Sequence, residues 1–373
     1  MEKHLHIVCL DVPYPVDHGG IFDLFYKITA LHQCGIRIHL HCFEYGRGQQ
    51  PELEKYCAKI YYYKRQLGHK GFSLQLPYIV SSRINGELYD RLLQDDSPIM
   101  LEGIHCSHLL LNEKFSHRKI FLRLHNVEYK YYRQLAKTSV NPFKKVYFLY
   151  ESYLLKKYEK SIAGKATILT VSNADAAVYE KEFGANRVMN LPVFLPFNEI
   201  QSHTGIGSFC LYHGNLSVAE NEKAALWLLK EVFNDIKIPF VIAGKDPPGR
   251  LEKAAHLQNN TCLVANPSWA EMQDMISKAQ INIIPSFNTT GIKLKLLNVL
   301  YNGRHCVVNE ATTSGSGLEA ACFTGINAPA MKSIIIQLYH QPFGEEEILL
   351  RKSLLEANFD NLRNARLLIT WIW

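Results

Sequence analysis

Short apolar runs, each followed by a turn and then by a helical pattern, recur along this 373-residue chain and restrict its fold more than any other feature. Residues 5–10 form the first run, which predicts a buried strand. Leu24, Ile28 and Leu31 follow at helical spacing, and residues 36–42 then alternate between apolar and polar side chains. A strand, a helix and a second strand within about 40 residues form a βαβ unit, which predicts a parallel sheet with crossover helices.

The same order of elements starts again after residue 207. Residues 209–212 predict a strand and residues 221–233 a helix. Ser268 and Glu271 form a capping box, which predicts the start of another helix. Further strands are predicted at residues 239–243, 261–265, 281–284 and 305–308.

The length of the chain predicts two domains at about 150 residues per domain. We expect one α/β domain at residues 1–200 and a second at residues 207–356, with a linker of low periodicity at residues 197–208. In tandem α/β domains, the carboxyl ends of both sheets can face one ligand in a cleft between the domains. Functional residues are therefore expected on loops that follow strands.

The composition excludes several classes of protein. No apolar run reaches the roughly 18 to 20 residues that span a bilayer, and no secretory signal precedes the first strand, so we expect a cytoplasmic protein. The nine cysteines include no Cys-x-x-Cys pair, which predicts reduced core residues rather than a zinc or disulfide framework. Four of them lie in apolar runs: Cys9, Cys210, Cys262 and Cys306. A formal charge of +6 is too small to indicate a nucleic-acid-binding protein.

Two loops that follow strands are rich in small residues. The first carries Asp17, Gly19 and Gly20 directly before a helix, and the second carries Ser314 and Gly315. Such loops let the backbone approach a ligand and direct amide donors at an anion or a sugar hydroxyl. An ordinary turn and a flexible connection account for them equally well. The Gly-x-Gly-x-x-Gly pattern is absent, which disfavours a nicotinamide enzyme.

His125 follows the apolar run at residues 120–124, and Glu102 and His105 follow another run in the same way. A histidine at the carboxyl end of a parallel sheet can donate a hydrogen bond to a substrate hydroxyl, or accept one from it, near neutral pH. A purely structural histidine is the alternative. We interpret His125 as a candidate catalytic residue, and Glu102 and His105 as weaker candidates for contact with a substrate.

The loop that ends in Thr290 and Gly291 leads into a helix whose first turn is predicted to carry Lys293 and Lys295. Lysines are unfavourable at a helix N-terminus unless an anion neutralises them. A phosphate group bound between these lysines and the helix amides would remove the conflict. Among the residues considered by themselves, this is the strongest indication of a binding site.

Four strings of residues, in their order and spacing, resemble the retaining glycosyltransferases of family 4, which have the GT-B fold. They are Pro-Tyr-Pro-x-Asp-x-Gly-Gly at 13–20, His-Asn-Val-Glu at 125–128, Tyr-His-Gly-Asn at 212–215, and Gly-Ile-Lys-Leu-Lys-Leu-Leu at 291–297. The resemblance covers nearly the whole chain, and bacterial mannosyltransferases are among the similar proteins. It implies two Rossmann-like domains with parallel sheets that face each other across a cleft. It also implies that residues 357–373 form a closing helix that packs back on the N-terminal domain.

The resemblance implies transfer of a hexose, of mannose or glucose type, in cell-surface polysaccharide synthesis. The donor would be a UDP- or GDP-linked sugar held mainly by the second domain, the acceptor a glycan or lipid-linked sugar held mainly by the first, and no further cofactor is implied. By position, the catalytic residues would be His125, against the donor sugar, and Lys293 and Lys295, on the diphosphate. The donor-binding residues would be Gly19, Gly20, Gly214, Asn215, Asn266, Thr290, Gly291, Asn298, Ser314 and Gly315, and the acceptor-binding residues Asp17, Glu102 and His105.

The chain departs from the family at residues that bind the donor. The usual Glu-x7-Glu pair falls on Thr290 and Asn298. Asn215 and Glu220 stand where the family has an arginine and a lysine. Lys293 and Lys295 would therefore supply most of the positive charge at the donor site. These departures leave two alternatives open, a non-catalytic GT-B protein that binds sugar nucleotides and a GT-B epimerase.

The charges that form during the reaction indicate its mechanism. Cleavage of the donor builds positive charge at the anomeric carbon and negative charge on the β-phosphate. The chain has no Asp-x-Asp sequence that would hold a metal, so lysines and helix amides would stabilise the negative charge. We expect a metal-independent reaction, with front-face attack and retention of configuration because no carboxylate pair is available as nucleophile and acid.

Residues 130–165 predict a loose contact with a membrane. Nine lysines and arginines between Lys130 and Lys165 are interleaved with tyrosines and other large apolar residues. This mixture suits an anionic leaflet and would place the protein peripherally at the inner face of a membrane. A solvated pair of helices is the alternative.

Overall fold

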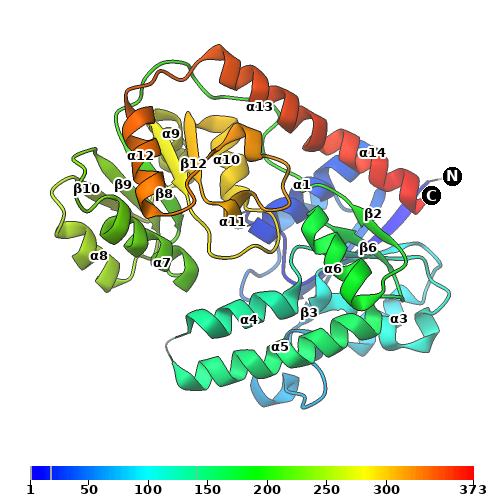
Figure 1. Ribbon diagram of the computed structural model, residues 1–373. Coiled ribbons are helices and arrows are strands. Elements are labelled where there is room, and N and C mark those ends of the chain that lie inside the picture. The colour runs from blue at the N-terminus through cyan, green and yellow to red at the C-terminus, as the bar shows by residue number, and fades with distance from the viewer. Residues whose placement is uncertain (1, 17–18, 140) are drawn as a thin grey trace. The chain divides into compact units, whose positions relative to one another are not determined.

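The computed structural model describes residues 2–16, 19–139 and 141–373, and its contacts divide the chain into two compact units. The first unit is Met1–Pro196 together with Phe359–Trp373, and the second is Phe197–Asn358. Each unit contains one parallel sheet with helices packed against it (Figure 1). The predicted α/β class, with two Rossmann-like domains, is confirmed.

The first unit is built on a seven-stranded parallel sheet in the order β3-β2-β1-β4-β5-β6-β7. Its strands are β1 (His4–Cys9), β2 (Arg37–Glu44), β3 (Lys59–Lys64), β4 (Ile99–Glu102), β5 (Ile120–Leu124), β6 (Thr167–Thr170) and β7 (Val188–Asn190). Its α-helices are α1 (Gly19–Gln33), α2 (Tyr78–Ser81), α3 (Gly86–Leu92), α4 (Glu128–Thr138), α5 (Pro142–Ile162), α6 (Asn173–Phe183) and α14 (Asn361–Ile372).

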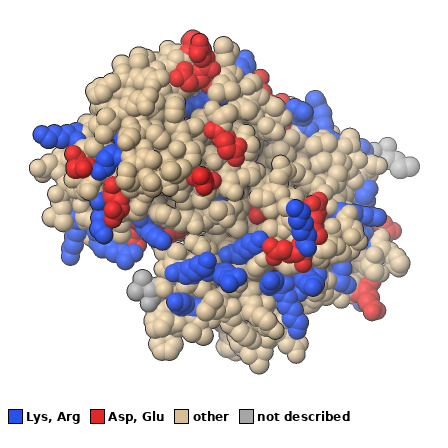
Figure 2. Space-filling view, viewed as in Figure 1, with Lys and Arg blue, Asp and Glu red and all other residues tan. Residues whose placement is uncertain are grey.

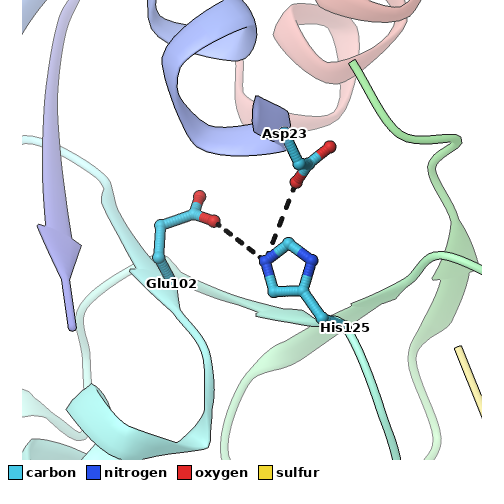
Figure 3. A group of neighbouring side chains, drawn as sticks. All are labelled: Asp23, Glu102 and His125. Atoms are coloured by element: carbon cyan, nitrogen blue, oxygen red, sulfur yellow. Dashed lines mark ion pairs between the residues drawn. The ribbon is translucent and has the colours of Figure 1, made fainter. Parts of the chain in front are cut away.

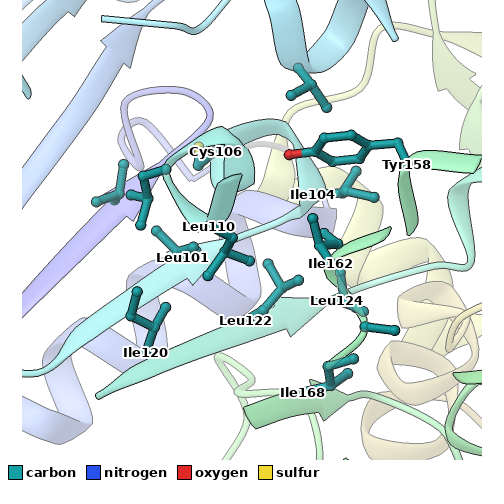
Figure 4. Packing of buried hydrophobic residues seen from close by; sticks show 14 of the residues in the cluster. Leu101, Ile104, Cys106, Leu110, Ile120, Leu122, Leu124, Tyr158, Ile162 and Ile168 are labelled. Carbon is teal, nitrogen blue, oxygen red and sulfur yellow. The ribbon is translucent and has the colours of Figure 1, made fainter. Parts of the chain in front are cut away.

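Both faces of the first sheet are buried, because successive side chains of each strand enter opposite cores. On one face, Met100 and Phe121 pack with residues of α1 and α14 such as Leu24 and Leu368. On the other face, the core contains residues of β4 and β5 and residues of α5 (Figure 4). The central strands therefore appear in the sequence as continuous apolar runs.

The second unit has a six-stranded parallel sheet in the order β10-β9-β8-β11-β12-β13. Its strands are β8 (Cys210–Asn215), β9 (Phe240–Lys245), β10 (Thr261–Ala265), β11 (Ile281–Ile284), β12 (His305–Val308) and β13 (Phe323–Thr324). Its α-helices are α7 (Ala219–Trp227), α8 (Gly249–His256), α9 (Trp269–Lys278), α10 (Leu294–Asn302), α11 (Glu310–Thr313), α12 (Ala328–Tyr339) and α13 (Glu345–Asn358). Across the described part of the chain, no helix has both the length and the hydrophobicity needed to cross a membrane.

The segment predicted as a linker, residues 197–208, is part of the second unit. Gly205 and Phe343 exchange two backbone hydrogen bonds of 2.9 Å, and the Gln201 amide donates to the Tyr301 carbonyl at 2.7 Å. These bonds attach the segment to α10 and to the loop before α13. The second unit therefore begins at Phe197 rather than at residue 207.

One local prediction in the second unit is wrong. Cys262 was expected in the core but is exposed, because it lies on β10, an edge strand whose side chains are only partly covered. The helix predicted at 221–233 is confirmed: it comprises α7, which ends at Trp227, and a π-helical turn that continues it over Leu228–Val232. The capping box of Ser268 and Glu271 is confirmed at the start of α9.

Candidate active site

Charged side chains meet at the carboxyl edge of the first sheet, near the point where the strand order reverses between β1 and β4. Glu102 ends β4 and pairs in register with Arg123 of β5, so both side chains lie on the same face of the sheet. α1 packs on that face and brings in Asp23 and Lys27, which are one helical turn apart. In open α/β sheets, this edge is where ligands bind.

Asp23 is the centre of this cluster and is fully buried. Arg123 donates two parallel hydrogen bonds to it, from Nε to Oδ2 at 3.2 Å and from Nη2 to Oδ1 at 3.1 Å. The Phe194 amide also donates to Oδ1, at 2.8 Å. Burial alone would raise the pKa of Asp23, but the neighbouring cations, Arg123 foremost, outweigh burial and hold the pKa well below its ordinary value. The carboxylate is therefore ionised at neutral pH.

Lys27 lies between two carboxylates. Its Nζ is 3.1 Å from Oδ2 of Asp23 and 2.9 Å from Oε1 of Glu102, and its side chain is fully buried. Burial acts to raise the pKa of Glu102, but Lys27 and then His125 reverse that effect and lower the pKa. Together with Arg123, Lys27 neutralises both carboxylates inside the protein.

His125 lies at the outer side of the cluster (Figure 3). Its Nε2 is 3.8 Å from Oδ2 of Asp23 and 3.8 Å from Oε2 of Glu102, and 21% of its side chain is exposed. The ring therefore faces buried carboxylates on one side and is accessible on the other. It can reach a ligand from its accessible side, and the carboxylates behind it favour positive charge at this position. Ligand atoms of Asp23, Glu102 and His125 lie within 4.8 Å of one another, as in a metal site, but the Lys27 ammonium already lies between the two carboxylates. These residues thus fit a metal ion poorly.

A second buried carboxylate holds the backbone that follows His125. Glu159 accepts hydrogen bonds from the amides of Glu128 and Tyr129, at 3.0 and 3.1 Å, in the first turn of α4, and from the Tyr179 hydroxyl at 2.6 Å. Burial raises the pKa of Glu159 to about 7 and that of Glu128 to about 8. Glu159 therefore fixes the start of α4 and, with it, the loop that carries His125.

The equivalent edge of the second sheet lies between β8 and β11, where its strand order reverses. Gly214 and Asn215 end β8 at this edge. A Cβ at the neighbouring Gly244 would lie 1.8 Å from the Gly214 carbonyl oxygen, so the two strands can pair only with glycine there. Asn215 accepts hydrogen bonds from the amide of Ser217 at 3.1 Å and from its hydroxyl at 2.7 Å, which closes the turn before α7.

Lys295 reaches this edge from the first turn of α10. Its Nζ donates to Oδ1 of Asn221 at 3.2 Å and lies 5.0 Å from the centroid of the Tyr212 ring. The charge of Glu220 acts to raise the pKa of Lys295, although the two residues form no ion pair in the described part of the chain. Burial lowers the pKa of Lys295 to about 8. The neighbouring His213 is also buried, and its Nε2 has no hydrogen-bond partner among the described residues.

Lys293 is the N-cap of α10 and not a residue of its first turn, so this detail of the prediction is wrong. Its Nζ donates to the Thr290 carbonyl at 2.5 Å. Oδ1 of Asn288 accepts from the Thr290 amide at 2.9 Å and from the Thr290 hydroxyl at 3.0 Å. Gly291 adopts a left-handed conformation with φ of +64°. The loop before α10 is thus a tight turn that directs Lys293 back onto its own backbone.

Four other predicted donor-binding residues lie in the second unit. Asn298 is buried in α10 and accepts a hydrogen bond within that helix at 2.8 Å. Asn266 follows β10, two strands from β8, and accepts from the Asp246 amide at 2.8 Å. Ser314 and Gly315 lie half-buried in the loop after α11. The structure therefore brings a set of predicted residues to one switch point and places Asn266 away from it. The set is Gly214 and Asn215 at the end of β8, Thr290, Gly291 and Lys293 in the loop before α10, and Lys295 in its first turn.

The predicted acceptor-binding residues have different environments in the first unit. Glu102 is buried beside His125, so it can act on a ligand only through that ring. His105 is half-buried, and its Nδ1 has no partner in the described ranges. Asp17 lies outside the described residues. Gly19 and Gly20 of the same segment, which were predicted to bind the donor, begin α1.

Asp23, Lys27 and Arg123 were not identified from the sequence, although two signals were present. Arg123 is a charged residue within a run that otherwise predicts a fully buried strand. Asp23 and Lys27 are four residues apart, next to the apolar residues of the same helix. A buried charge requires a partner, so these signals indicate that a pair exists without indicating which residues form it.

Comparisons with known proteins give one relative by sequence. No family model matches the chain. An uncharacterized 44.6 kDa protein in the cps region of Klebsiella pneumoniae is 27% identical over 332 residues, which are 83% of this chain and 84% of that protein.

Solved structures similar to this one include two GT-B glycosyltransferases. HepE of Anabaena, in complex with UDP and glucose, has a TM-score of 0.69 at 11% identity and covers 100% of this chain and 99% of its own. A mutant of S. aureus TarM, in complex with Fondaparinux, alpha-GlcNAc-glycerol and UDP, has a TM-score of 0.68 at 12% identity, with 99% of both chains covered. The likeness extends over both units, and the chain has the GT-B fold.

Proposed function

We propose that this protein is a retaining, metal-independent glycosyltransferase that moves a hexose of mannose or glucose type from a UDP- or GDP-linked donor to a glycan or lipid-linked acceptor. The GT-B fold and the UDP bound in both HepE and TarM support a nucleotide-sugar donor. The relative from a cps region is in keeping with cell-surface polysaccharide synthesis in the cytoplasm.

The observation that carries the proposal is Lys295, a half-buried lysine at the switch point of the second sheet. It forms no ion pair with a described carboxylate, and burial outweighs the charge of Glu220 that acts on it. A buried cation is unfavourable unless an opposite charge compensates for it. The donor diphosphate supplies two negative groups of suitable chemistry, and Lys293 lies on the adjoining turn. We therefore assign the donor to the second unit, with Gly214, Thr290 and the loop at Ser314 beside it.

The reaction follows from these charges. The acceptor hydroxyl oxygen bonds to the anomeric carbon as the bond from that carbon to the β-phosphate oxygen breaks, and the acceptor proton passes to the departing phosphate oxygen. The products are a glycoside and a nucleoside diphosphate. Lys293 and Lys295 stabilise the charge on the leaving group without a metal ion. We assign to His125, which is backed by two carboxylates, the role of acting on the donor sugar, and to the first unit the binding of the acceptor.

One observation favours a second candidate function, a GT-B protein that binds sugar nucleotides without transferring them. Thr290 and Asn298 replace the two carboxylates of the family, and both are buried and already hydrogen-bonded within the protein. An epimerase is the third alternative. It would release free nucleotide in the absence of an acceptor.

Measurement of nucleotide release and glycoside formation from UDP- and GDP-sugars tests the proposal. His125→Asn should lower turnover roughly 100-fold while leaving UDP or GDP affinity unchanged, because His125 acts on the sugar and not on the diphosphate. His256→Asn, an exposed histidine of α8, is the matched control. Nucleotide binding without any product would favour the non-catalytic alternative, and absence of nucleotide binding would refute the proposal.

A further inference from the structure

The first half of α5 carries a row of large apolar side chains that face solvent. Phe143 is 85% exposed and Val146 67% exposed, and Tyr147, Tyr150 and Tyr153 are exposed on the same side. Their spacing of three and four residues places them on one face of the helix. Exposed apolar surface of this extent indicates a binding surface.

A second segment of the first unit extends this surface. The Tyr150 hydroxyl donates to the Leu74 carbonyl at 2.9 Å, and the buried Glu151 accepts from the Tyr78 amide at 2.9 Å. Leu74 is 70% exposed, and Phe72 beside it is exposed as well. The two hydrogen bonds attach the loop before α2 to α5. We call the exposed apolar residues of α5 and this loop the α5 surface.

The charges around the α5 surface are positive. Lys144 and Lys145 are exposed in the first turns of α5, and residues 142–150 contain no Asp or Glu. Further along the helix, Lys157 and Lys160 are exposed too. The lysines and arginines of this unit gather over α4 and α5 in the space-filling view (Figure 2). Apolar and aromatic side chains bordered by lysines suit the boundary between lipid headgroups and acyl chains.

We propose that the α5 surface binds the face of an anionic lipid bilayer. This rests on the proposed function, because a bound membrane would bring a lipid-linked acceptor to the enzyme. The proposed contact is smaller than the one predicted at residues 130–165. Lys130 of α4 forms an ion pair with Glu182 at 2.8 Å, so we do not include it among the residues that bind lipid. A second copy of the chain fits less well, because a symmetric pair would place Lys144 and Lys145 against their own equivalents.

Flotation of the full chain with vesicles tests the proposal, using phosphatidylcholine alone and phosphatidylcholine mixed with phosphatidylglycerol. The chain should float with the anionic vesicles and only weakly with the neutral ones. Phe143→Ser combined with Val146→Ser should lower the partition coefficient roughly 10-fold or more, since both side chains lose the apolar contact with lipid. Lys144→Glu combined with Lys145→Glu should remove the preference for anionic vesicles.

Matched controls lie in the second unit. Leu257, 85% exposed, and the exposed Lys230 are chemically similar but lie outside the α5 surface, so Leu257→Ser and Lys230→Glu should float as the unmodified chain does. All four side chains of the test variants are exposed, so the melting temperature should not change.

Three results would overturn the proposal. They are no flotation with anionic vesicles, flotation that the Phe143 and Val146 variant does not reduce, and a dimer in light scattering that the same variant converts to a monomer. UDP and GDP binding by these variants is measured in parallel. Retained nucleotide binding without flotation would leave the proposed function standing, whereas flotation without nucleotide binding would leave only the lipid surface.

Discussion

The carboxyl edges of the two sheets both carry charged side chains, but the two edges balance these charges in different ways. In the first unit, Asp23 and Glu102 are neutralised by Lys27 and Arg123 within the protein. In the second, Lys295 has amide and aromatic neighbours; the charge of Glu220 acts on it, but within the described ranges no carboxylate forms an ion pair with it. The charges of the first edge are thus balanced within the protein, whereas the second edge has a lysine that an anion from outside can neutralise. The same architecture can therefore position a histidine at one edge and bind a diphosphate at the other.

The largest expected effect comes from breaking the balance in the first unit. Asp23→Ala leaves the guanidinium of Arg123 and the ammonium of Lys27 buried without their shared partner. We expect the free energy of unfolding to fall by roughly 3 to 5 kcal/mol, measured by urea denaturation.

Asp274→Ala is the control for this prediction, because Asp274 forms an exposed ion pair with Lys278 on α9. The free energy of unfolding should fall by no more than about 1 kcal/mol in this variant. If Asp23→Ala lowers the free energy of unfolding as little as the control does, Asp23 does not neutralise Arg123 and Lys27 in the buried cluster.

The second unit should respond in the opposite manner, with loss of binding instead of loss of stability. Lys295→Ala should weaken UDP or GDP binding by roughly 1.5 to 3 kcal/mol, about 10- to 100-fold, because a charge-assisted hydrogen bond to the diphosphate is lost. Lys293→Ala should act in the same direction. Calorimetric titration measures the affinity and a melting curve the stability, with Lys230→Ala as the exposed control. Unchanged UDP and GDP affinity in both variants would mean that the diphosphate does not bind at Lys293 and Lys295.

A smaller effect should appear as a pH dependence of nucleotide binding. Burial lowers the pKa of Lys295 to about 8 in the free protein, and a bound diphosphate would raise it again. The affinity for UDP or GDP should therefore be at its maximum below pH 8, where Lys295 is charged. It should fall as the pH rises through 8, by at most tenfold per pH unit. Lys295→Arg, which stays charged, should abolish the fall. An equal fall in the arginine variant would assign the titration to another group.

The smallest expected effect is that of a chelator. Lys27 occupies the space between the carboxylates that a metal ion would need, and the diphosphate site relies on lysines. EDTA should leave both nucleotide affinity and turnover unchanged within error. Activity that is lost with EDTA and restored by Mg²⁺ or Mn²⁺ would contradict the metal-independent mechanism.

The fold could be predicted further than the charges within it. The predicted bounds of β5, β10, β11 and β12 match the structure, because each is an apolar run between clear turn signals. Cys262 shows where this reasoning fails, since an apolar neighbourhood does not reveal that a strand is at the edge of a sheet. The bond between Asp23 and Arg123 joins residues 100 positions apart, and no local pattern specifies such a pair.

Similar reasoning explains what could be predicted of the candidate site. Helix-dipole arguments drew attention to Lys293 and Lys295 because both lie near the start of a helix. They could not distinguish the two, because the difference depends on tertiary contacts. Lys293 turns back to the Thr290 carbonyl, whereas Lys295 is half-buried beside Tyr212. Which of the two is the stronger anion site is therefore a property of packing.

The discontinuity of the first unit has a consequence for biosynthesis. Its chain leaves at Pro196 and returns at Phe359, and α14 packs against α1 with Leu368 and Ile372 buried. About 160 residues separate these segments, so at 5 to 20 residues per second a ribosome needs roughly 8 to 30 s to supply the closing helix. During that interval the second unit can fold as a continuous segment, while the face of the first sheet that α14 covers remains open. The first unit is begun first and completed last.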